Sequence, residues 1–403
     1  MKKHVKQVIA TILSLVLVLG IGYEPTFANE TESAITATNT SIPTAQDISS
    51  GQITIGRIAD TSSKYYFIYT APNSGYVSFN LSRSDYSSTE SAAWCLTVYD
   101  ATMTKLEYKT YINSSYDTQP FMVQKGTTYY IEVCGSSSST TRIDYAIKAN
   151  FTSCSYVEKE NNNSGTKATK LVTGKKYIGC LNSSNDEDFF KIKADKLGYY
   201  KFSLNRYDFS TTDTPTWTMT VYDSSMNKLY SLNSTFNGDT NNTSGVYYVL
   251  PKGKTIYIKV SNSSSAVGHL YSIQTTFKKA SNIESEPNNS YTQADKIKIS
   301  TTYYGALGET STADYFYFKA TADKKYQVSI SLNRDVTYGY KLYVYDSSRK
   351  LVASSSNTIY KNGKLSFKAK KGKKYYVVVK HADTGFFGGY SVGTLYKLKV
   401  VKK

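Results

Sequence analysis

Lys371-Gly372-Lys373-Lys374-Tyr375-Tyr376-Val377-Val378-Val379 predicts a turn followed by a strand, because a Lys-Gly turn precedes an unbroken run of aromatic and β-branched residues. Two earlier stretches, 125–133 and 252–260, follow the same plan. Upstream of the three stretches one tripeptide recurs at intervals of 123 residues, as Val98-Tyr99-Asp100, Val221-Tyr222-Asp223 and Val344-Tyr345-Asp346. Such an internal repeat indicates tandem copies of one structural unit.

Each copy is about 120 residues long and carries short alternating runs separated by clusters of Gly, Asn, Ser and Asp. This length and spacing are typical of a β-sandwich, and the 39 tyrosines and 24 glycines of the chain favour strands and turns over helices. We therefore predict an all-β fold of three tandem β-sandwich modules. Their predicted bounds are 45–157, 158–280 and 281–403, with boundaries near 152–157 and 279–283.

The first 28 residues have the features of a secretory signal peptide. Three lysines precede an apolar run at 8–22, and Ala28, with Thr26 two residues before it, suits a signal peptidase. The run of 15 residues is short for a membrane span, which needs about 20 apolar residues, and no later run is long enough. We expect a secreted, extracellular protein, free or held non-covalently at a cell surface, with no membrane span. A flexible leader is expected at 29–44.

Positive charge increases along the chain. The formal charge is +17 for the whole chain and +15 without residues 1–28; it is about −1 for 45–157, +6 for 158–280 and +12 for 281–403. The basic last third predicts attraction to an anionic polymer, such as a wall polyanion or an acidic glycan, or else a lysine-rich surface that keeps the protein soluble. Nucleic acid is not expected as a partner, because the chain is exported and has no recognition motif.

All four cysteines, Cys95, Cys134, Cys154 and Cys180, lie in the first half of the chain. An oxidising compartment favours disulfides, and four cysteines allow three pairings. We expect Cys95 to pair with Cys134 and Cys154 with Cys180, because each of these pairs is local in the sequence. A zinc site is not expected, since no CxxC spacing occurs.

A longer motif opens the third unit and is repeated in the second. It runs Glu284-Ser285-Glu286-Pro287-Asn288-Asn289-Ser290, then Ala294, Gly305 and Asp314-Tyr315-Phe316. The second unit has Glu158-Lys159-Glu160-Asn161-Asn162-Asn163-Ser164, then Ala168, Gly179 and Asp188-Phe189-Phe190. In these residues the chain resembles the bacterial pre-peptidase C-terminal domain, a family related to the collagen-binding domains of clostridial collagenases; the first unit resembles it weakly. The resemblance implies a jelly-roll-like sandwich of the kind attached to secreted peptidases.

Acids and amides at every second position of this motif suit a calcium site. Calcium takes roughly six to eight oxygen ligands, and an extended segment points alternate side chains to one side. Glu284, Glu286 and Asn288 have this spacing, and the resemblance implies that they face Asp314, with Ser311 as a weaker ligand. The corresponding residues of the second unit are Glu158, Glu160, Asn162 and Asp188, with Asn185 weaker. The alternative is that these acids are solvated linker residues.

The first unit departs from this pattern. Aligned on Ala45, it has Ile35, Ala37 and Asn39 in the places of the two glutamates and the asparagine, and Lys64 in the place of the aspartate. We therefore expect no calcium in the first module.

Strand alternation divides the residues after each Lys-Gly turn between two faces. The predicted core face holds Tyr129, Ile131, Val133, Ile256, Ile258, Val260, Tyr375, Val377 and Val379. The opposite face carries one tyrosine at the same position of every unit, Tyr130, Tyr257 and Tyr376. An outward tyrosine suits stacking on a sugar ring or a proline-rich peptide, and in the collagen-binding relatives tyrosines on the exposed sheet face contact the ligand. The alternative is an ordinary cross-strand aromatic pair.

No catalytic set is predicted. Without the leader only His269 and His381 remain, in different units, and neither has the spacing of a catalytic triad or a zinc site. We expect a non-catalytic binding or adhesion protein that attaches to an extracellular polymer, either collagen-like protein or cell-wall and polysaccharide material, with calcium stabilising the second and third modules. The alternative is an accessory or targeting subunit for a separately encoded secreted peptidase.

Overall fold

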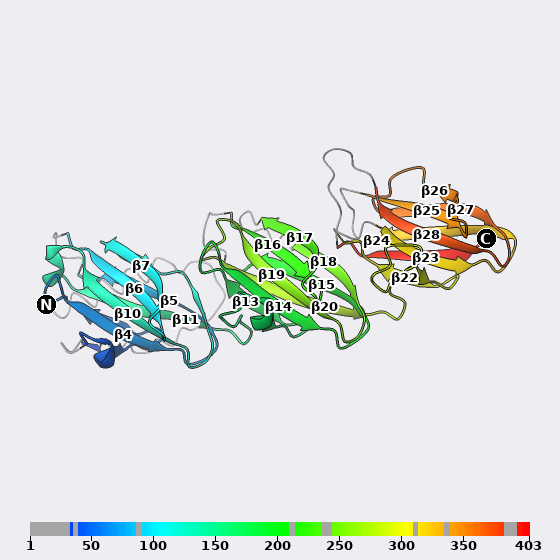
Figure 1. Cartoon of the computed structure of the whole chain (residues 1–403). Helices are drawn as coiled ribbons and strands as arrows, with labels where there is room; N and C mark the ends of the chain where they lie inside the picture. Colours follow the sequence, from blue (N-terminus) through cyan, green and yellow to red (C-terminus); the bar gives the residue numbers. More distant parts are fainter. Residues whose placement is uncertain are drawn as a thin grey trace, which may run out of the picture.

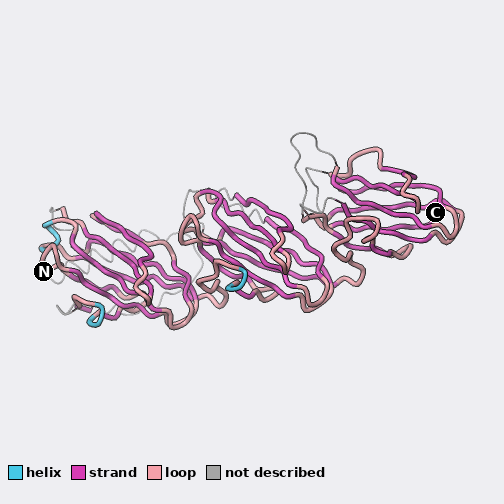
Figure 2. Tube along the Cα trace, viewed as in Figure 1, coloured by secondary structure: helices cyan, strands magenta, loops and turns pink. Residues whose placement is uncertain are grey.

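The structure, a computed structural model, describes residues 33–34, 39–85, 91–208, 214–235, 244–308, 313–333, 339–382 and 393–403, so the predicted signal peptide lies outside the described residues. Six β-sheets form three successive pairs, which lie end to end along an elongated molecule (Figure 1). Each pair is a β-sandwich, called module 1, 2 or 3 below, and the predicted all-β fold is confirmed. The described helical residues are short 3-10 segments, η1 (Ile42–Thr44), η2 (Ser138–Thr141) and η3 (Gly165–Lys167) (Figure 2). Over the described ranges, no helix has the length and apolar character to span a membrane.

Module 1 contains a six-stranded and a five-stranded sheet. The first has β1 (Ser33–Ala34), β3 (Ile53–Gly56), β11 (Tyr145–Ser153), β5 (Gly75–Arg83) and β8 (Ser115–Asp117) in that order, with β9 (Phe121–Val123) also paired to β5. The second has β2 (Gln46–Asp47), β4 (Lys64–Thr70), β10 (Thr128–Gly135), β6 (Trp94–Asp100) and β7 (Lys105–Ile112). Strand β1 and η1 place described residues of the predicted leader on this sandwich.

Modules 2 and 3 each contain a five-stranded and a four-stranded sheet in matching order. In module 2 these are β12 (Thr169–Lys170), β14 (Glu187–Lys193), β19 (Thr255–Ser264), β16 (Thr216–Tyr222) and β17 (Lys228–Thr235), and β13 (Lys176–Cys180), β20 (Leu270–Lys279), β15 (Gly198–Arg206) and β18 (Ser244–Leu250). In module 3 they are β21 (Asp295–Lys296), β23 (Ala313–Lys319), β28 (Lys374–His381), β25 (Tyr340–Asp346) and β26 (Leu351–Ser354), and β22 (Thr302–Gly305), β29 (Tyr396–Lys402), β24 (Lys324–Leu332) and β27 (Asn362–Ala369).

A separate hydrophobic core fills each sandwich. All nine residues of the predicted core face, from Tyr129 to Val379, are buried. Successive side chains of a strand point to opposite faces of the sheet, and here one face meets the core and the other meets solvent, which is why alternation predicted these residues. Each core therefore lies between two sheets of one module.

The repeated Val-Tyr-Asp tripeptide ends the strand before a tight turn. Its valine is buried in every module, and the aspartate accepts hydrogen bonds from backbone N–H groups two and four residues ahead; in module 2, Ser225 and Asn227 donate to Asp223 Oδ1 at 2.8 and 2.9 Å. The third residue after each aspartate has a positive φ, 62° at Met226. The carboxylate thus closes a turn that the backbone alone does not favour.

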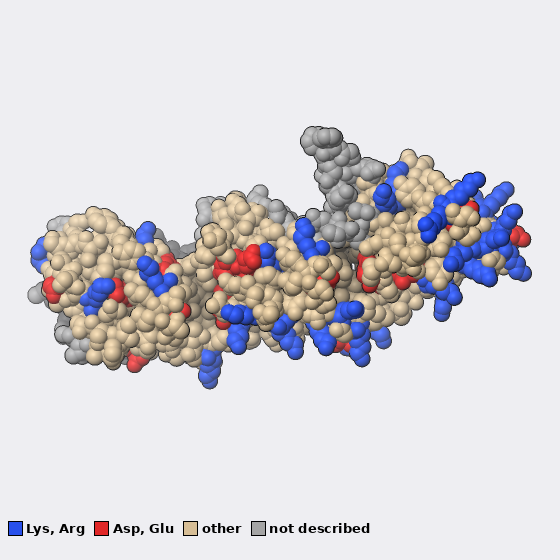
Figure 3. Space-filling view, in the orientation of Figure 1, with Lys and Arg blue, Asp and Glu red and all other residues tan. Residues whose placement is uncertain are grey.

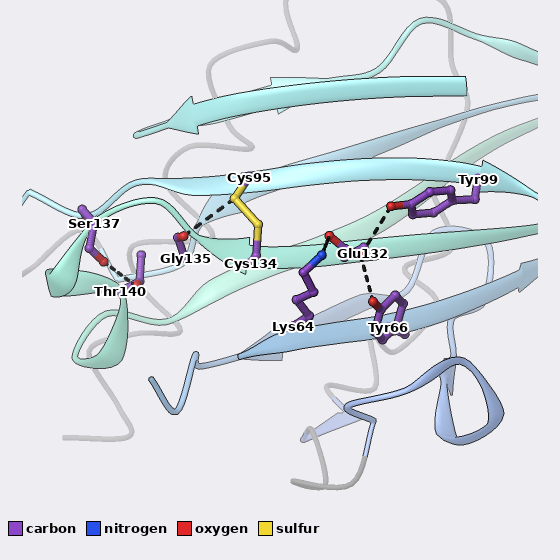
Figure 4. The surroundings of a disulfide bond; sticks show 9 residues. All are labelled: Lys64, Tyr66, Cys95, Tyr99, Glu132, Cys134, Gly135, Ser137 and Thr140. Carbon is purple, nitrogen blue, oxygen red and sulfur yellow. Dashed lines mark hydrogen bonds and ion pairs between the residues drawn. A yellow bond between two sulfur atoms is a disulfide. The ribbon is translucent and has the colours of Figure 1, made fainter. Parts of the chain in front are cut away.

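One of the two predicted disulfides is present. Cys95 and Cys134 lie opposite each other on β6 and β10 and are joined (Figure 4). The predicted pairing of Cys154 with Cys180 is wrong, because both are free thiols. Cys180 is instead buried in a small apolar cluster where module 1 meets module 2, with Met122, Val157, Ile178 and Leu270.

Candidate metal sites and ligand-binding face

The predicted ligands of module 2 converge at the start of the sandwich. One carboxylate oxygen each from Glu158, Glu160 and Asp188 lies within 4.8 Å of the others. Glu158 and Asp188 are buried, whereas Glu160 is exposed. Asn162 is buried beside them, and its backbone carbonyl accepts a hydrogen bond from Phe189 N–H at 3.0 Å. The structure therefore brings all four predicted residues together.

A buried tyrosine holds the two innermost carboxyl groups. The hydroxyl of Tyr271 is 2.9 Å from Glu158 Oε2 and 2.6 Å from Asp188 Oδ2, and Cys180 N–H donates to Glu158 Oε1 at 2.8 Å. Burial, together with the charge of Glu160, raises the pKa of Glu158 to about 8. Without a cation, protons are thus expected to neutralise part of this cluster near neutral pH.

Module 3 repeats the tyrosine and backbone contacts of module 2, but among the described residues a group of three carboxylates within 4.8 Å of one another occurs in module 2 and not in module 3. The hydroxyl of Tyr396 is 2.9 Å from Glu284 Oε2 and 2.5 Å from Asp314 Oδ2, and Ala306 N–H donates to Glu284 Oε1 at 2.7 Å. The backbone carbonyl of Asn288 accepts from Tyr315 N–H at 2.8 Å. Burial and the charge of Glu286 raise the pKa of Asp314 to about 8.

One amide side chain lies in each cluster with its nitrogen directed at carboxylate oxygens. Asn162 donates to Glu160 Oε2 and to Asp188 Oδ1, both at 3.0 Å. Asn288 donates to Asp314 Oδ1 at 3.2 Å and to Glu286 Oε2 at 3.3 Å. Rotation of either amide by 180° would instead turn its oxygen towards a cation held between these carboxylates.

The structure does not place either weaker ligand candidate in these clusters. Asn185 is exposed, and its neighbour Asp186 is buried, accepting hydrogen bonds from the backbone N–H groups of Asn182 and Glu187. Ser311 lies outside the described residues. Asn182 was not predicted, although its Nδ2 donates to Glu160 Oε1 at 3.1 Å and its buried Oδ1 has no hydrogen-bond partner among the described residues.

Glycine is required beside each cluster for a steric reason. A Cβ at Gly179 would lie 2.4 Å from the Tyr271 hydroxyl and 2.7 Å from Glu158 Oε2. A Cβ at Gly305 would lie 2.3 Å from both the Tyr396 hydroxyl and Glu284 Oε2. The glycines of the sequence motif thus make room for the tyrosines that it does not include. Sequence reasoning missed Tyr271 and Tyr396, because they lie more than 80 residues from their partners.

Module 1 has the framework of the site without its carboxylates. Asn39 occupies the predicted place, because its carbonyl accepts from Tyr66 N–H at 2.8 Å as those of Asn162 and Asn288 accept in their modules. The assignment of Lys64 to the aspartate position is wrong by one residue. Tyr65 lies opposite Val133, as Asp188 lies opposite Val260 and Asp314 opposite Val379. Ile35 and Ala37 lie outside the described residues.

The error arose because module 1 has three consecutive aromatic residues where module 2 has two, so the motif could be aligned in two registers. The tyrosine of the site is retained. Tyr145 lies opposite Gly56, as Tyr271 lies opposite Gly179, and its buried hydroxyl has no hydrogen-bond partner in the part of the chain that the structure describes.

Lys64 instead makes an ion pair on the outer face of its sheet. Its Nζ is 2.9 Å from Glu132 Oε1, and the hydroxyls of Tyr66 and Tyr99 donate to Glu132 Oε2 (Figure 4). Module 2 has the same pair with the charges exchanged, Glu187 with Lys259 at 2.6 Å.

The predicted outward tyrosines lie on the outer face of the five-stranded sheets, where each is half-buried. Their surroundings differ. Tyr130 lies between Ile68 and Tyr99, and Tyr257 between Lys191 and Tyr222. In module 3 Tyr376 lies between two further tyrosines, Tyr317 and Tyr345.

Six tyrosines form an aromatic face on module 3. Tyr291 packs edge-to-face against three others, with ring centroids 4.9 Å from Tyr315, 5.0 Å from Tyr376 and 5.7 Å from Tyr345. Tyr317 and Tyr343 extend the face at its edges. Arg349 lies 5.0 Å from the ring centre of Tyr291, and Lys374 lies 4.7 Å from that of Tyr317. Tyrosines at every second position of β23 and β25 could have predicted this face from the sequence, but only Tyr376 of the face was predicted.

The acidic segments of modules 2 and 3 line grooves that face the preceding module. A groove between modules 1 and 2 is lined by Gln124 and Thr127 of module 1 and by Glu158, Glu160 and Asp186 of module 2. Gln124 Nε2 donates to the carbonyl of Glu158 at 3.0 Å. A second groove, between modules 2 and 3, is lined by Asp223 and Lys254 together with Glu286 and Pro287. The acidic segment of each module is therefore also its contact with the module before it.

Comparison with known proteins found no matching family model and no matching curated protein. Among solved structures, the chain is similar to the pre-peptidase C-terminal domain of collagenase from Bacillus anthracis, with 24% identity over 27% of this chain and 93% of that chain, and a TM-score of 0.22. The N-terminal tandem CBM22 domains of Paenibacillus barcinonensis Xyn10C match at 9% identity over 56% of this chain and 86% of that chain, with a TM-score of 0.19.

Tripeptidyl peptidase 2 matches at 8% identity over 83% of this chain, with a TM-score of 0.21, and the match spans 33% of that chain. Identities and TM-scores this low carry no information about what this chain binds.

Proposed function

We propose that this chain is a secreted, non-catalytic binding protein that holds an extended extracellular polymer on the aromatic face of module 3. The observation that carries the proposal is the group of six tyrosines around Tyr291 and Tyr376. The tyrosines are half-buried, so each presents part of a ring to solvent. The Cys95–Cys134 disulfide is consistent with an oxidising, extracellular setting.

The geometry of this face suits a linear ligand. Tyr317, Tyr376 and Tyr345 lie opposite one another on β23, β28 and β25, so they form a row across three strands spaced about 4.8 Å apart. Flat rings with hydroxyl groups stack on sugar rings and on proline rings while donating hydrogen bonds at their edges. Collagen-like protein and polysaccharide both present such rings repeatedly, so both remain in the proposal as ligand classes.

The same proposal includes one calcium ion in module 2 and one in module 3. The donor set is all oxygen, as calcium requires: Glu158, Glu160, Asn162 and Asp188 in one module and Glu284, Glu286, Asn288 and Asp314 in the other. Two buried carboxyl groups in each cluster need a proton or a cation, and each amide can turn its oxygen to a bound cation. Calcium would neutralise the cluster and hold the acidic segment against its sandwich.

Co-sedimentation tests the binding proposal. The purified chain is mixed with insoluble collagen, peptidoglycan or cellulose, with calcium or with a chelator. We expect retention on at least one of these materials and at least a roughly tenfold loss of affinity for Tyr376→Ala, as for an interface aromatic worth about 1.4 kcal/mol or more. Tyr257→Ala is the matched control, because it removes the same tyrosine from a module without the aromatic cluster.

Equal losses for the two variants would contradict the assignment to module 3. Retention on none of the materials, together with co-purification of a secreted peptidase, would favour the accessory-subunit alternative instead.

A further inference from the structure

Module 3 has a second outer face that differs chemically from the aromatic one. It belongs to the four-stranded sheet β22-β29-β24-β27, on the other side of the sandwich. The core-facing residues of these strands include Tyr326, Val328, Leu398 and Val400, all buried, so the residues between them point outward. The outward positions are Thr302, Tyr304, Lys325, Gln327, Ser329, Ser331, Asn362, Lys364, Ser366, Lys368, Lys397, Lys399 and Val401.

Five of these positions are lysine, and none is Asp or Glu. Strand pairing fixes their arrangement. Ser329 of β24 pairs with Lys364 of β27 on one side and with Lys399 of β29 on the other. Lys325 of β24 pairs with Lys368 of β27. Lys397 and Lys399 are two residues apart on one strand, hence about 7 Å apart, whereas Lys364 and Lys399 are separated by two strand spacings, about 10 Å.

These charges are not neutralised by neighbours. No ion pair involves any of the five lysines in the described ranges, and four of them are exposed; Lys399 is half-buried. Figure 3 shows Lys and Arg side chains crowded on module 3, most densely towards the end that carries the C-terminus. The segment 281–403 holds 21 Lys and Arg against nine Asp and Glu, and two of those acids, Glu284 and Asp314, are buried.

The equivalent faces of the other modules carry fewer lysines. In module 2 the outward lysines of the four-stranded sheet are Lys176, Lys201 and Lys278. In module 1 the corresponding face has Lys148 and an acid, Asp117, whose Oδ1 accepts a hydrogen bond from Asn150. The number of outward lysines on this face therefore rises from one in module 1 to three in module 2 and five in module 3. The five-stranded sheet of module 3 also has five outward lysines, Lys296, Lys319, Lys341, Lys374 and Lys380, but these flank the tyrosines, and Lys374 lies over the rings of Tyr317 and Tyr376.

We propose that this face of module 3 binds a linear polyol-phosphate polymer. Five unpaired ammonium groups complement a regularly charged polyanion, and serine and threonine hydroxyls between them can donate to phosphate oxygens. The face has lysine and no arginine, so it offers compact point charges, which bind phosphate without the planar two-point geometry of an arginine. Its one aromatic ring, Tyr304, contacts Tyr199 and Lys397, so the face lacks a platform for stacking nucleic-acid bases.

The proposal is independent of the aromatic face. Module 3 would then hold two different polymers on opposite sides, a neutral one on the tyrosines and a polyanion on the lysines. A protein with this property connects the two materials.

Poly(glycerol phosphate) immobilised on a sensor surface is the probe, with the complete exported chain in solution. Neutralisation of five phosphates predicts a slope of about −3.5 in log affinity against log salt, using the value for flexible single strands. Affinity should then fall about 100-fold between roughly 50 and 200 mM NaCl. We expect replacement of Lys325, Lys364, Lys368, Lys397 and Lys399 by Thr to lower affinity about 100-fold at the lower salt concentration and to flatten the slope.

The matched control replaces five lysines on the opposite side of the sandwich, on the outer face of the five-stranded sheet and its β25–β26 turn, Lys296, Lys319, Lys341, Lys350 and Lys380, by Thr. It changes the net charge equally and should alter affinity less than about threefold. Circular dichroism and thermal melting establish that both variants are folded. Tyr376→Ala should bind the polymer like the unmodified chain.

Equal losses in the two five-lysine variants would overturn the proposal, because they would reduce it to a general charge effect. Absence of binding at the lower salt concentration would also overturn it. Equal affinity for polyglutamate, or higher affinity for single-stranded DNA, would show that the face does not select a polyol phosphate.

Discussion

Tyr145, Tyr271 and Tyr396 occupy one position in three modules and differ in what their hydroxyls contact. Two of them donate to a pair of buried carboxyl groups, and the third has no partner among the described residues. Tyr145 is therefore an internal control for the contribution of this hydrogen bond to stability.

Tyr271→Phe should destabilise module 2, and Tyr396→Phe module 3, by about 1.5–3 kcal/mol, because each removes the single O–H group that lies between two buried carboxyl groups. Tyr145→Phe should leave module 1 unchanged or more stable, since it removes a hydroxyl that is buried without a partner. Hydrogen exchange resolved by module measures each effect. Equal destabilisation of all three modules would contradict this account of the site.

The buried carboxyl groups also predict how stability depends on pH when calcium is chelated. The pKa of Glu158 is about 8 in the folded protein against an ordinary value of 4.5, so the folded state binds the extra proton. This stability is fully present below about pH 4.5 and is lost as the pH rises through about 8.

Thermal melts of the calcium-free chain should therefore show the module 2 transition falling between pH 5 and 8, roughly the interval between the two pKa values. Glu158→Gln removes one of the titrating groups and should reduce this dependence, while Glu160, whose pKa is raised to about 7 by desolvation of its carboxyl group, continues to titrate. Calcium should restore stability at the upper end. A module 2 transition that rises over this interval without calcium would show that the carboxyl groups are ionised and satisfied by other means.

At the scale of single elements, alternation was sufficient to predict which residues of β10, β19 and β28 enter the core. The alignment of β4 was not predictable in the same way. Tyr65, Tyr66 and Phe67 fit the motif in two registers, and only the pairing of Tyr65 with Val133 decides between them. The cysteines show the same limit, because proximity in sequence predicted one pair correctly and the other wrongly.

The exchanged ion pairs of modules 1 and 2 give a test at this scale. Lys64→Glu should lower the stability of module 1 by about 1 kcal/mol, because a second carboxylate then faces the buried Glu132. The double change, Lys64→Glu with Glu132→Lys, reproduces the arrangement of Glu187 and Lys259 and should recover at least half of the loss. If the loss of stability in the double variant equals the sum of the losses in the two single variants, the two side chains do not interact.

At the scale of the whole molecule, three sandwiches of one plan carry different surfaces. Module 3 has tyrosines flanked by lysines on one sheet and lysines among serines on the other, and the acidic segments of modules 2 and 3 line the grooves between modules. The repeat and the all-β fold could be predicted from the sequence, because both depend on local patterns. The grooves and the apolar cluster around Met122 and Leu270 could not, because they depend on how one module packs against the next.

The number of calcium ions bound by the whole chain tests the central claim most directly, namely that one site is present twice and has been lost once. Isothermal titration calorimetry on the chain beginning at Asn29 should give two ions per molecule. Glu158→Gln should leave one, Glu158→Gln with Glu284→Gln should leave none, and Asp195→Asn, an exposed acid of module 2, should leave two. Binding of no ions by the unmodified chain, of three, or of two by the double variant would contradict the account.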